Sequence, residues 1–168
     1  VWIPSPNGRF NFSHMWEHLF GNQPKVEWHH LVWFSCAISR QSFILWLAIQ
    51  KRLSTQDRIP EFTQGPLACY FCHKAIENHD HLCFSCDYTL FVWQGILDRL
   101  AIQTRTTTWI EMVTFASVHW KRKVPTYLIP RISLGATLYY LWRKRNGRAF
   151  RKEFKPKEQV LKEIVHII

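Results

Sequence analysis

The chain has 168 residues, of which 47% are apolar and 15% aromatic, so it can bury a core and is not a globally disordered chain. Its continuous apolar runs fall short of the ~18 residues that a membrane-spanning helix needs, so we expect no membrane partner. The formal net charge is +10. Residues 1–118 carry nine basic and nine acidic side chains, whereas residues 119–168 carry 13 and three. The last third should therefore carry the charges that face a partner.

The first 12 residues are predicted to form an extended lead that folds into a short β-hairpin. Two prolines disfavour a helix there, and Asn7-Gly8 is a turn signal between two short apolar runs. A helix should follow over residues 14–20, because the hydroxyl of Ser13 can cap it by accepting a hydrogen bond from a free backbone N–H. Gly21 should end this helix.

Two apolar segments follow, over residues 28–38 and 43–53, and both are predicted to be helical. The second is apolar on every side between Phe43 and Ile49, and a helix of that kind must be buried on every side. We therefore expect it to be the central helix of the core. A buried strand is the alternative for so short an apolar run. Cys36, alone in the first segment, should lie in the core.

Loops and helices are predicted to alternate over the rest of the chain. Residues 60–68 indicate a loop, 69–86 hold a cluster of cysteine and histidine, and a helix over 89–102 would place Leu90, Trp93 and Leu97 on one face. A linker at 104–108 and a helix at 109–120 should follow. Pro125 and Pro130 are expected to interrupt the chain before a helix over 132–152, and a last helix should begin near Pro156.

Four residues have the spacing of zinc ligands, in the pattern Cys69-x2-Cys72-x8-His81-x4-Cys86. Two thiolates three positions apart in a tight turn can point at one ion, and His81 and Cys86 can supply a second pair. Three soft thiolates and one imidazole suit tetrahedral Zn²⁺. Because four protein ligands leave no position for water or substrate, we expect one structural zinc ion.

Three neighbouring side chains could compete as ligands. His73 and His79 lie in the same segment, and Cys83 lies only two positions from His81. Cys83 stands between two apolar residues, so we interpret it instead as a small buried hydrophobic side chain.

The cysteine count and the nearby acids bear on the compartment and on catalysis. An odd number of cysteines with C-x-x-C spacing indicates metal binding in a reducing intracellular compartment rather than disulfides. Asp80 or Asp87 could accept a hydrogen bond from the ring of His81. A zinc hydrolase would need an open metal position and a general base, for which Glu77 is the nearest glutamate, so we expect no enzyme in this segment.

The basic residues of the last third form clusters that could bind nucleic acid. If residues 132–152 are helical, their Lys and Arg side chains form a stripe that suits a phosphate backbone. Trp142 and Phe150 lie between these charges and are expected to turn into the core rather than stack on bases. The candidate nucleic-acid-binding residues are Lys121, Arg122, Lys123, Arg143, Lys144, Arg145, Arg148, Arg151 and Lys152.

Four stretches of the chain resemble one family. They are Trp2 with residues 8–10 and Ser13; residues 32–34, 43–49 and 52–59; the pattern of Cys69, Cys72, Glu77, His81, Leu82, Cys86 and Trp93; and residues 142–150. Together they are similar to the zinc-binding domain that lies C-terminal to the reverse transcriptase in plant non-LTR (LINE-type) retrotransposon polyproteins. The chain departs from this family's pattern at Ser39-Arg40, where Pro-Lys is common, and at Cys83, where an apolar or aromatic residue is usual.

Pattern and resemblance together predict a mainly α fold. We expect a small helical domain with a short N-terminal β-hairpin and a zinc-knuckle-like insertion, followed by a basic helical tail. The expected divisions are the lead at 1–12, the zinc-binding domain at 13–103 and the basic C-terminal extension at 104–168. Because the first residue is Val1 rather than Met, we also expect a piece of a longer polyprotein.

The resemblance implies a non-catalytic accessory domain that works beside a reverse transcriptase in the nucleus. It would bind template RNA or target DNA through the basic C-terminal helix, with little sequence specificity, since phosphate contacts carry little of it. The alternative is a zinc-stabilised protein-interaction module that docks on the polymerase or on a host factor. Exposed aromatic side chains around Trp28 and Trp93 would favour that alternative.

Overall fold

The computed structural model describes residues 8–21, 24–59, 67–104, 106–121 and 124–168. Its α-helices are α1 (Phe12–Phe20), α2 (His29–Val32), α3 (Ser39–Ile49), α4 (Asp87–Arg99), α5 (Trp109–His119), α6 (Pro125–Arg151) and α7 (Lys157–Ile167). The chain also forms a 3-10 turn, η1 (Gln56–Arg58), and a π turn, η3 (His81–Ser85). No strand forms within the described ranges, where an isolated antiparallel bridge pairs Ala68 with Ile76. Among the helices described, none combines the length and the hydropathy that a membrane crossing requires.

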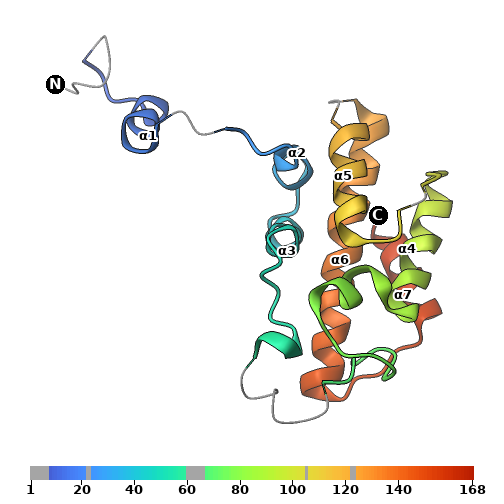
Figure 1. The fold of residues 1–168 in the computed structure, drawn as a ribbon. Coiled ribbons are helices and arrows are strands. Elements are labelled where there is room, and N and C mark those ends of the chain that lie inside the picture. The colour runs from blue at the N-terminus through green and yellow to red at the C-terminus, as the bar shows by residue number, and fades with distance from the viewer. Residues whose placement is uncertain (1–7, 22–23, 60–66, 105, 122–123) are drawn as a thin grey trace.

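The central helix is α6. It runs through the body in Figure 1, with α2 and α3 on one side and α4 and α7 on the other. Leu134, Leu138 and Leu141 recur along it at helical spacing, and each is no more than 2% exposed. The break expected at Pro130 is absent, whereas the helical structure is interrupted between α5 and α6 just before Pro125. Pro125 lies in the first turn, where its missing N–H is not needed, and Pro130 stays inside the helix because packing on both sides outweighs one lost hydrogen bond.

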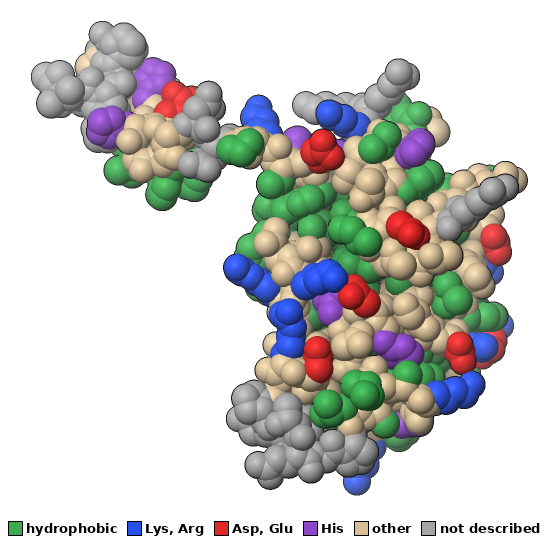
Figure 2. All heavy atoms as spheres, viewed as in Figure 1, with side chains coloured by type: hydrophobic (Ala, Val, Ile, Leu, Met, Phe, Trp, Pro, Cys, Tyr) green, Lys and Arg blue, Asp and Glu red, His purple; other side chains and the backbone are tan. Residues whose placement is uncertain are grey.

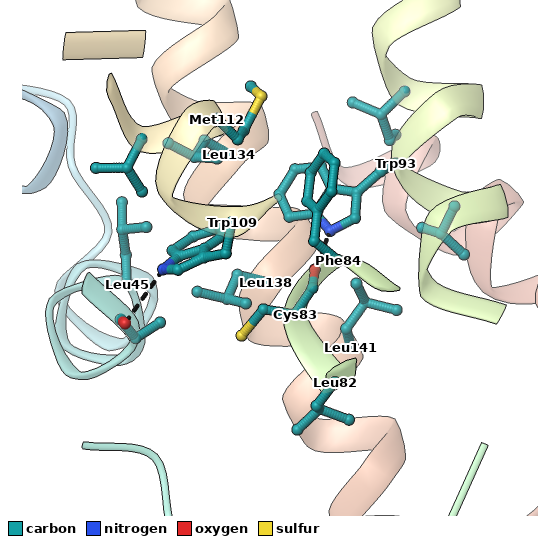
Figure 3. Packing of buried hydrophobic residues seen from close by; sticks show 14 of the residues in the cluster. Leu45, Leu82, Cys83, Phe84, Trp93, Trp109, Met112, Leu134, Leu138 and Leu141 are labelled. Atoms are coloured by element: carbon teal, nitrogen blue, oxygen red, sulfur yellow. Dashed lines mark hydrogen bonds between the residues drawn. The ribbon is translucent and has the colours of Figure 1, made fainter. Parts of the chain in front are cut away.

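Two buried tryptophans connect the elements at the centre of the core (Figure 3). The ring N–H of Trp93 in α4 donates to the carbonyl of Cys83 at 2.7 Å, and that of Trp109 in α5 donates to the carbonyl of Ala48 in α3 at 3.2 Å. Both side chains are 1% exposed. Each ring buries a large apolar area and also satisfies its polar N–H, so it holds two elements in a defined relative position.

The N-terminal region differs from the sequence prediction. Residues 8–11 form no strand and Phe12 already belongs to α1, so the second strand of the expected β-hairpin does not form. Its first strand and the turn at Asn7 fall at residues 1–7, outside the described residues. Asn11, not Ser13, caps α1, because its side-chain oxygen accepts from the N–H groups of Ser13 and His14 at 2.8 and 3.4 Å. None of the side chains of α1 is buried, and the helix lies apart from the body in Figure 1.

The two apolar segments after α1 form helices whose bounds differ from the predicted ones: α2 is shorter, and α3 begins and ends four residues earlier. α2 ends at Val32 because Trp33 is extended, and Cys36 is exposed beyond it rather than buried in the core. α3 buries one face, which includes Leu45 and Ala48, while Phe43 is 56% exposed. The prediction that this helix is central and buried on every side is therefore wrong. α6 occupies the centre, and α3 packs on one side of it.

The later helices lie close to their predicted positions. α4 begins at Asp87, slightly earlier than expected, and Pro156 is the N-cap of α7 instead of part of its first turn. α5 begins at a capping box, in which the Thr108 hydroxyl accepts from the N–H of Glu111 at 3.3 Å and the Glu111 carboxylate accepts from the N–H of Thr108 at 3.2 Å. Most of the loop predicted at 60–68 falls outside the described residues.

Candidate metal centre

Cys69 and Cys72 lie in a tight turn closed by backbone hydrogen bonds. The N–H of Cys69 donates to the carbonyl of Ala75 at 2.8 Å, and the N–H of His73 donates to the carbonyl of Cys69 at 2.9 Å. His73 has a φ of 56°, in the left-handed region, so the chain changes direction directly after Cys72. The N–H of Phe71 also points at the sulfur of Cys69, at 3.4 Å. The turn thus presents both sulfurs together, as the C-x2-C spacing predicts.

His81 and Cys86 approach from the other side of this turn. His81 begins the π turn η3 and Cys86 is its C-cap, whose N–H donates to the carbonyl of His81 at 2.9 Å. Single π turns are frequent at functional sites. Cys86 is also the N-cap of α4, so its sulfur lies at the start of a helix. The positive end of the helix dipole favours a thiolate at that position.

The four candidate ligand atoms converge. A ring nitrogen of His81 and the sulfurs of Cys69, Cys72 and Cys86 all lie within 4.8 Å of one another. The sulfurs of Cys69 and Cys86 are 3.9 Å apart, and the sulfur of Cys72 is 3.4 Å from Nε2 of His81. On one tetrahedral zinc ion, two sulfurs lie about 3.8 Å apart, and a sulfur and an imidazole nitrogen about 3.6 Å apart. These residues therefore form a possible single metal site that fits zinc.

The protonation of the two buried sulfurs is consistent with metal binding. A hydrogen bond to Cys86, followed by burial, raises the pKa of the Cys69 thiol. The same hydrogen bond, helped by the N–H groups of Tyr88 and Thr89 at the start of α4, lowers the pKa of Cys86. Both directions follow from the closeness of the two sulfurs, and a metal cation bound there would require both of them as thiolates.

Cys83 and His79 form a separate pair inside the core. The sulfur of Cys83 lies 3.6 Å from Nε2 of His79, and the residues are 1% and 5% exposed. Burial raises the pKa of the Cys83 thiol and lowers the pKa of His79, so both favour the neutral form. Figure 3 shows Cys83 among the apolar core residues. It is the small buried side chain that the sequence predicted, and neither residue belongs to the converging group.

The aspartates next to the ligands have lysine partners. Asp80 accepts a hydrogen bond from Lys51 at 3.0 Å, and Asp87 accepts one from Lys74 at 3.1 Å. The sequence suggested that one of these carboxylates accepts a hydrogen bond from the ring of His81. The contacts of the described residues give neither of them that role.

Glu77 is held in a buried ion pair. Nε of Arg145 in α6 donates to Oε1 of Glu77 at 3.0 Å, a terminal nitrogen of the same guanidinium donates to the same oxygen, and the side chains are 1% and 0% exposed. The N–H groups of Gln56 and Tyr70 donate to this carboxylate at 3.1 and 3.5 Å. A carboxylate bound in this way anchors the metal turn to α6, and it is not free to serve as the general base of a hydrolase.

Arg148 is a second connection between α6 and the metal turn. Its guanidinium donates to the carbonyls of Tyr70 and Phe71 at 2.9 and 3.1 Å, and to that of Lys155 at 2.9 Å. It also lies over the rings of Phe71 and Tyr88, which stack with their centroids 4.3 Å apart. α6 therefore supports the segment between the first two ligands.

Two candidate nucleic-acid-binding residues consequently face the protein instead of an exposed stripe. Arg145 is 1% exposed and Arg148 is half-buried. This corrects the prediction of a continuous basic stripe along the helix. The reason is that their partners, Glu77 and the carbonyls of the metal turn, come from a distant part of the chain.

The other candidate residues lie nearer the surface. Lys144 pairs with Glu163 and Arg151 pairs with Glu153, each at 2.7 Å. Arg122 and Lys123 fall outside the described residues. The candidates that are exposed and have no carboxylate partner among the described residues are Lys121, Arg143 and Lys152.

Aromatic side chains surround the guanidinium of Arg145. Trp142 turns inward as expected, with its ring centroid 5.2 Å from this group, and the ring of Tyr70 lies 5.0 Å from it. Phe150, which was expected to turn inward as well, is 64% exposed.

The sequence did not indicate that Tyr70 and Tyr88 pack against the guanidinium groups of Arg145 and Arg148. No local pattern could have indicated them, because the arginines that cover these rings lie far along the chain.

Comparison with known proteins identifies one family, and its match to the chain includes the metal centre. Residues 10–93 match the family described as zinc-binding in reverse transcriptase. The match covers half of the 168-residue chain and includes all four converging ligands. It ends within α4, so it leaves out α6, which anchors the metal turn. No curated protein and no solved structure matched the chain.

Proposed function

Because the chain belongs to the family of zinc-binding domains in reverse transcriptases, we propose that it is a zinc-stabilised accessory module that binds nucleic acid for an adjacent reverse transcriptase. Template RNA or target DNA is the proposed ligand. An origin in a plant LINE-type retrotransposon and action in the nucleus belong to the same proposal, and the support for both is the sequence resemblance alone.

Zinc has a structural part in this proposal. Three sulfurs and one imidazole would fill the four positions of a tetrahedral zinc ion, so no position would remain on it for a substrate. The ion would join the turn at Cys69 and Cys72 to the start of α4, and the free energy of metal binding would then stabilise the fold.

The excess positive charge of the last third supports nucleic-acid binding. Residues 119–168 carry 13 basic and three acidic side chains, and the ion pairs formed there do not alter that sum. Lys121, Arg143 and Lys152 are exposed members of this group. When such lysine and arginine side chains bind a phosphate backbone, they displace the counterions condensed on it. The affinity should therefore fall steeply as the salt concentration rises.

The test compares two sets of charge reversals that lower the net charge equally. Binding of the zinc-loaded chain to single-stranded RNA and to nicked duplex DNA is measured by fluorescence anisotropy at two salt concentrations. The variant with charge reversals at Lys121, Arg143 and Lys152 should bind at least about tenfold more weakly and with a smaller salt dependence. The variant with reversals at Lys25, Arg40 and Arg52 should bind within about twofold of the unmodified chain. The sets are Lys121→Glu with Arg143→Glu and Lys152→Glu, and Lys25→Glu with Arg40→Glu and Arg52→Glu.

Two outcomes would reject the proposal. Equal weakening in both variants would mean that the charges of the last third form no local site. Binding without salt dependence would mean that phosphate contacts do not drive it. Arg145 is left out of the variants because reversing its charge would break a buried ion pair and so disturb the fold.

Exposed aromatic side chains near the N-terminus favour docking on a protein as a second candidate function. In α1, Phe12, Trp16 and Phe20 are 74%, 58% and 52% exposed, and Trp33 and Phe43 are 58% and 56% exposed. Figure 2 shows hydrophobic side chains gathered on one side of α1. The exposed aromatic surface thus differs from the expected one, because Trp93 is buried in the core.

A pull-down with a purified reverse transcriptase domain separates the two functions. Capture that persists after nuclease treatment and is lost in a Trp16→Asp, Phe20→Asp variant would support docking through α1. Capture that nuclease abolishes would support a nucleic-acid bridge between the two proteins.

A further inference from the structure

A basic cleft lies between α2 and the beginning of α6, and none of its lining residues belongs to the metal centre. Its volume is about 590 Å³, within the range of sites that hold small ligands. None of the described residues that line it is acidic. The lining includes four basic side chains and two aromatic ones, which are His29, His30, Lys121, Arg131, Trp33 and Phe34.

The basic groups of the cleft produce a positive potential. Arg131 is 4% exposed, burial lowers its pKa, and its Nε donates to the carbonyl of Tyr127 at 3.1 Å. Burial is also the main reason that the pKa of His30 is lowered, and the positive charges of His29, Arg131 and Lys121 lower it further. An anion in the cleft would relieve this repulsion.

His30 lacks a well-formed hydrogen bond. The residue is 8% exposed, and neither ring nitrogen has a partner of normal geometry among the described residues. The carbonyl of Glu27 nevertheless lies close enough to favour the protonated ring. Buried polar groups are nearly always bonded in native structures, so an unsatisfied imidazole beside a cleft suggests that a polar partner is missing.

Aromatic rings lie next to these charges. Trp33 is 58% exposed, and its ring centroid lies 5.8 Å from that of Trp28. The ring of Phe34 lies 5.5 Å from the guanidinium of Arg131. An exposed aromatic ring beside cations is the combination with which proteins bind an unpaired base and its phosphate.

The beginning of α6 adds to the attraction for an anion. Val124 and Leu128 line the same cleft, and Val124 is the N-cap of this 27-residue helix. Valine has no polar side chain to accept from the N–H groups of the first turn. The positive end of the helix dipole is therefore left for a ligand or for water.

We propose that this cleft binds one nucleotide unit of a single-stranded nucleic acid. The phosphate would lie among His29, Lys121 and Arg131, and the base would lie against Trp33. This goes beyond the proposed binding by the charges of the last third. Those charges recognise any phosphate backbone, whereas a base can stack on Trp33 only where the strand is unpaired.

Adenosine 5′-monophosphate is the probe for the site. It is titrated into the zinc-loaded full chain while the imidazole signals of His29 and His30 are followed by NMR. The nucleotide should shift both signals and raise the pKa of His30, and adenosine or inorganic phosphate alone should bind at least about tenfold more weakly. Unchanged imidazole signals at millimolar nucleotide, or inorganic phosphate binding as well as the nucleotide, would overturn the site.

Two variants test the two halves of the site, and both replace exposed residues so that the fold is preserved. Lys121→Gln should weaken nucleotide binding at least about fivefold, and Trp33→Leu should abolish the preference for nucleotide over inorganic phosphate. Lys162→Gln is the matched control, because it removes the same charge from an exposed position on α7 that does not line the cleft, and it should change binding less than about twofold. Equal losses for Lys121→Gln and Lys162→Gln would indicate general charge attraction and would defeat the proposal.

Two further comparisons test whether the ligand is a strand or a free nucleotide, and whether the cleft is a site distinct from the charges of the last third. Tighter binding of a single-stranded hexanucleotide than of the free nucleotide, lost in Trp33→Leu, would support a strand as the ligand, whereas the reverse order would overturn it. An Arg143→Glu, Lys152→Glu variant should lose RNA affinity and keep mononucleotide binding. Loss of both in this variant would show that the cleft is not a distinct site.

Discussion

Glu77 and Arg145 lie 68 positions apart in the chain, and their carboxylate and guanidinium form a buried ion pair in which Nε of Arg145 lies 3.0 Å from Oε1 of Glu77. Glu77 belongs to the segment with the metal ligands, and Arg145 belongs to α6. The pair thus joins the part of the chain that matches the zinc-binding family to a helix beyond that match. Burying two charges is unfavourable unless each is fully bonded, so the position of the metal turn depends on α6.

Removing the charge of Glu77 should strongly destabilise the protein. We expect Glu77→Gln to lower the free energy of unfolding by about 3–5 kcal/mol, because the guanidinium of Arg145 would stay buried without a counter-charge. Urea unfolding at saturating zinc, followed by tryptophan fluorescence, measures the change. Glu153→Gln is the control: it removes the same charge from an exposed pair with Arg151 and should alter stability little. Similar losses for the two variants would contradict the anchoring role.

Zinc content should depend on the four converging residues and not on their neighbours. The wild-type chain should bind about one zinc ion, and Cys72→Ser should lose it because a hydroxyl is a poor substitute for a thiolate. Hydrogen exchange should then rise across residues 69–93, since metal binding supplies folding free energy there. Cys83→Ala and Cys36→Ala should retain the ion, as measured by inductively coupled plasma mass spectrometry. Zinc lost from Cys83→Ala, or retained by Cys72→Ser, would refute the assignment.

The space beside two helical glycines, Gly95 and Gly135, predicts opposite effects for their substitution by alanine. A Cβ at Gly95 would lie 2.4 Å from Cδ2 of Leu161, so the buried leucine must move, and we expect Gly95→Ala to cost about 1 kcal/mol of stability or more. A Cβ at Gly135 in α6 would meet nothing closer than 3.6 Å, so Gly135→Ala should gain about 0.5–1 kcal/mol from helix propensity. Thermal unfolding of both variants tests the sign. A stabilising Gly95→Ala would mean that α4 and α7 are not so closely packed.

The pairing of Glu163 predicts an acid-dependent loss of stability. Hydrogen bonds from Lys144 and then Lys155 lower the pKa of Glu163 below its usual 4.5. A lowered pKa in the folded state adds stability above the pKa of the unfolded chain, and that stability is lost as the pH falls through the folded value. Glu163→Gln should therefore cost about 0.5–1 kcal/mol at pH 7, and the difference from wild type should shrink below about pH 5. Urea unfolding across this range measures it, and a difference that does not change with pH would contradict the explanation.

Two tryptophans should differ sharply in their importance for stability. Trp109 is 1% exposed and donates to the carbonyl of Ala48, so Trp109→Ala should cost about 3–5 kcal/mol. Trp16 lies on α1, which has no buried residue, so Trp16→Ala should cost less than about 0.5 kcal/mol. Chemical unfolding of the two variants gives the comparison. A large loss for Trp16→Ala would show that α1 packs against the body in solution.

The candidate metal ligands could be predicted from the sequence because their geometry is local. All four lie within 18 positions, and short-range hydrogen bonds at Cys69, His73 and Cys86 bring them together. The helices α5 and α7 were also predictable, since the capping residue Thr108 and the proline before α7 act on their own neighbours. Patterns of this kind depend on a few adjacent residues, which the sequence displays directly.

The basic helix was harder to interpret for the opposite reason. Its periodicity correctly indicated a helix, but periodicity alone does not reveal which cations have partners. Arg145 and Arg148 turn to Glu77 and to the carbonyls of the metal turn, which lie roughly 70 or more positions earlier in the chain. The same limit explains the error over α3, whose apolar residues indicated burial but not which helix would occupy the centre.

The sequence by itself determined the candidate ligand set, the buried character of Cys83, most helix positions and the concentration of charge in the last third. Only the tertiary structure decided that α6 is the central helix, that Arg145 is buried and that a basic cleft lies beside α2. The physical reason is the range of the interactions. Turns, caps and metal-ligand spacing act between near neighbours, whereas burial and charge pairing depend on segments that meet only after the chain has folded.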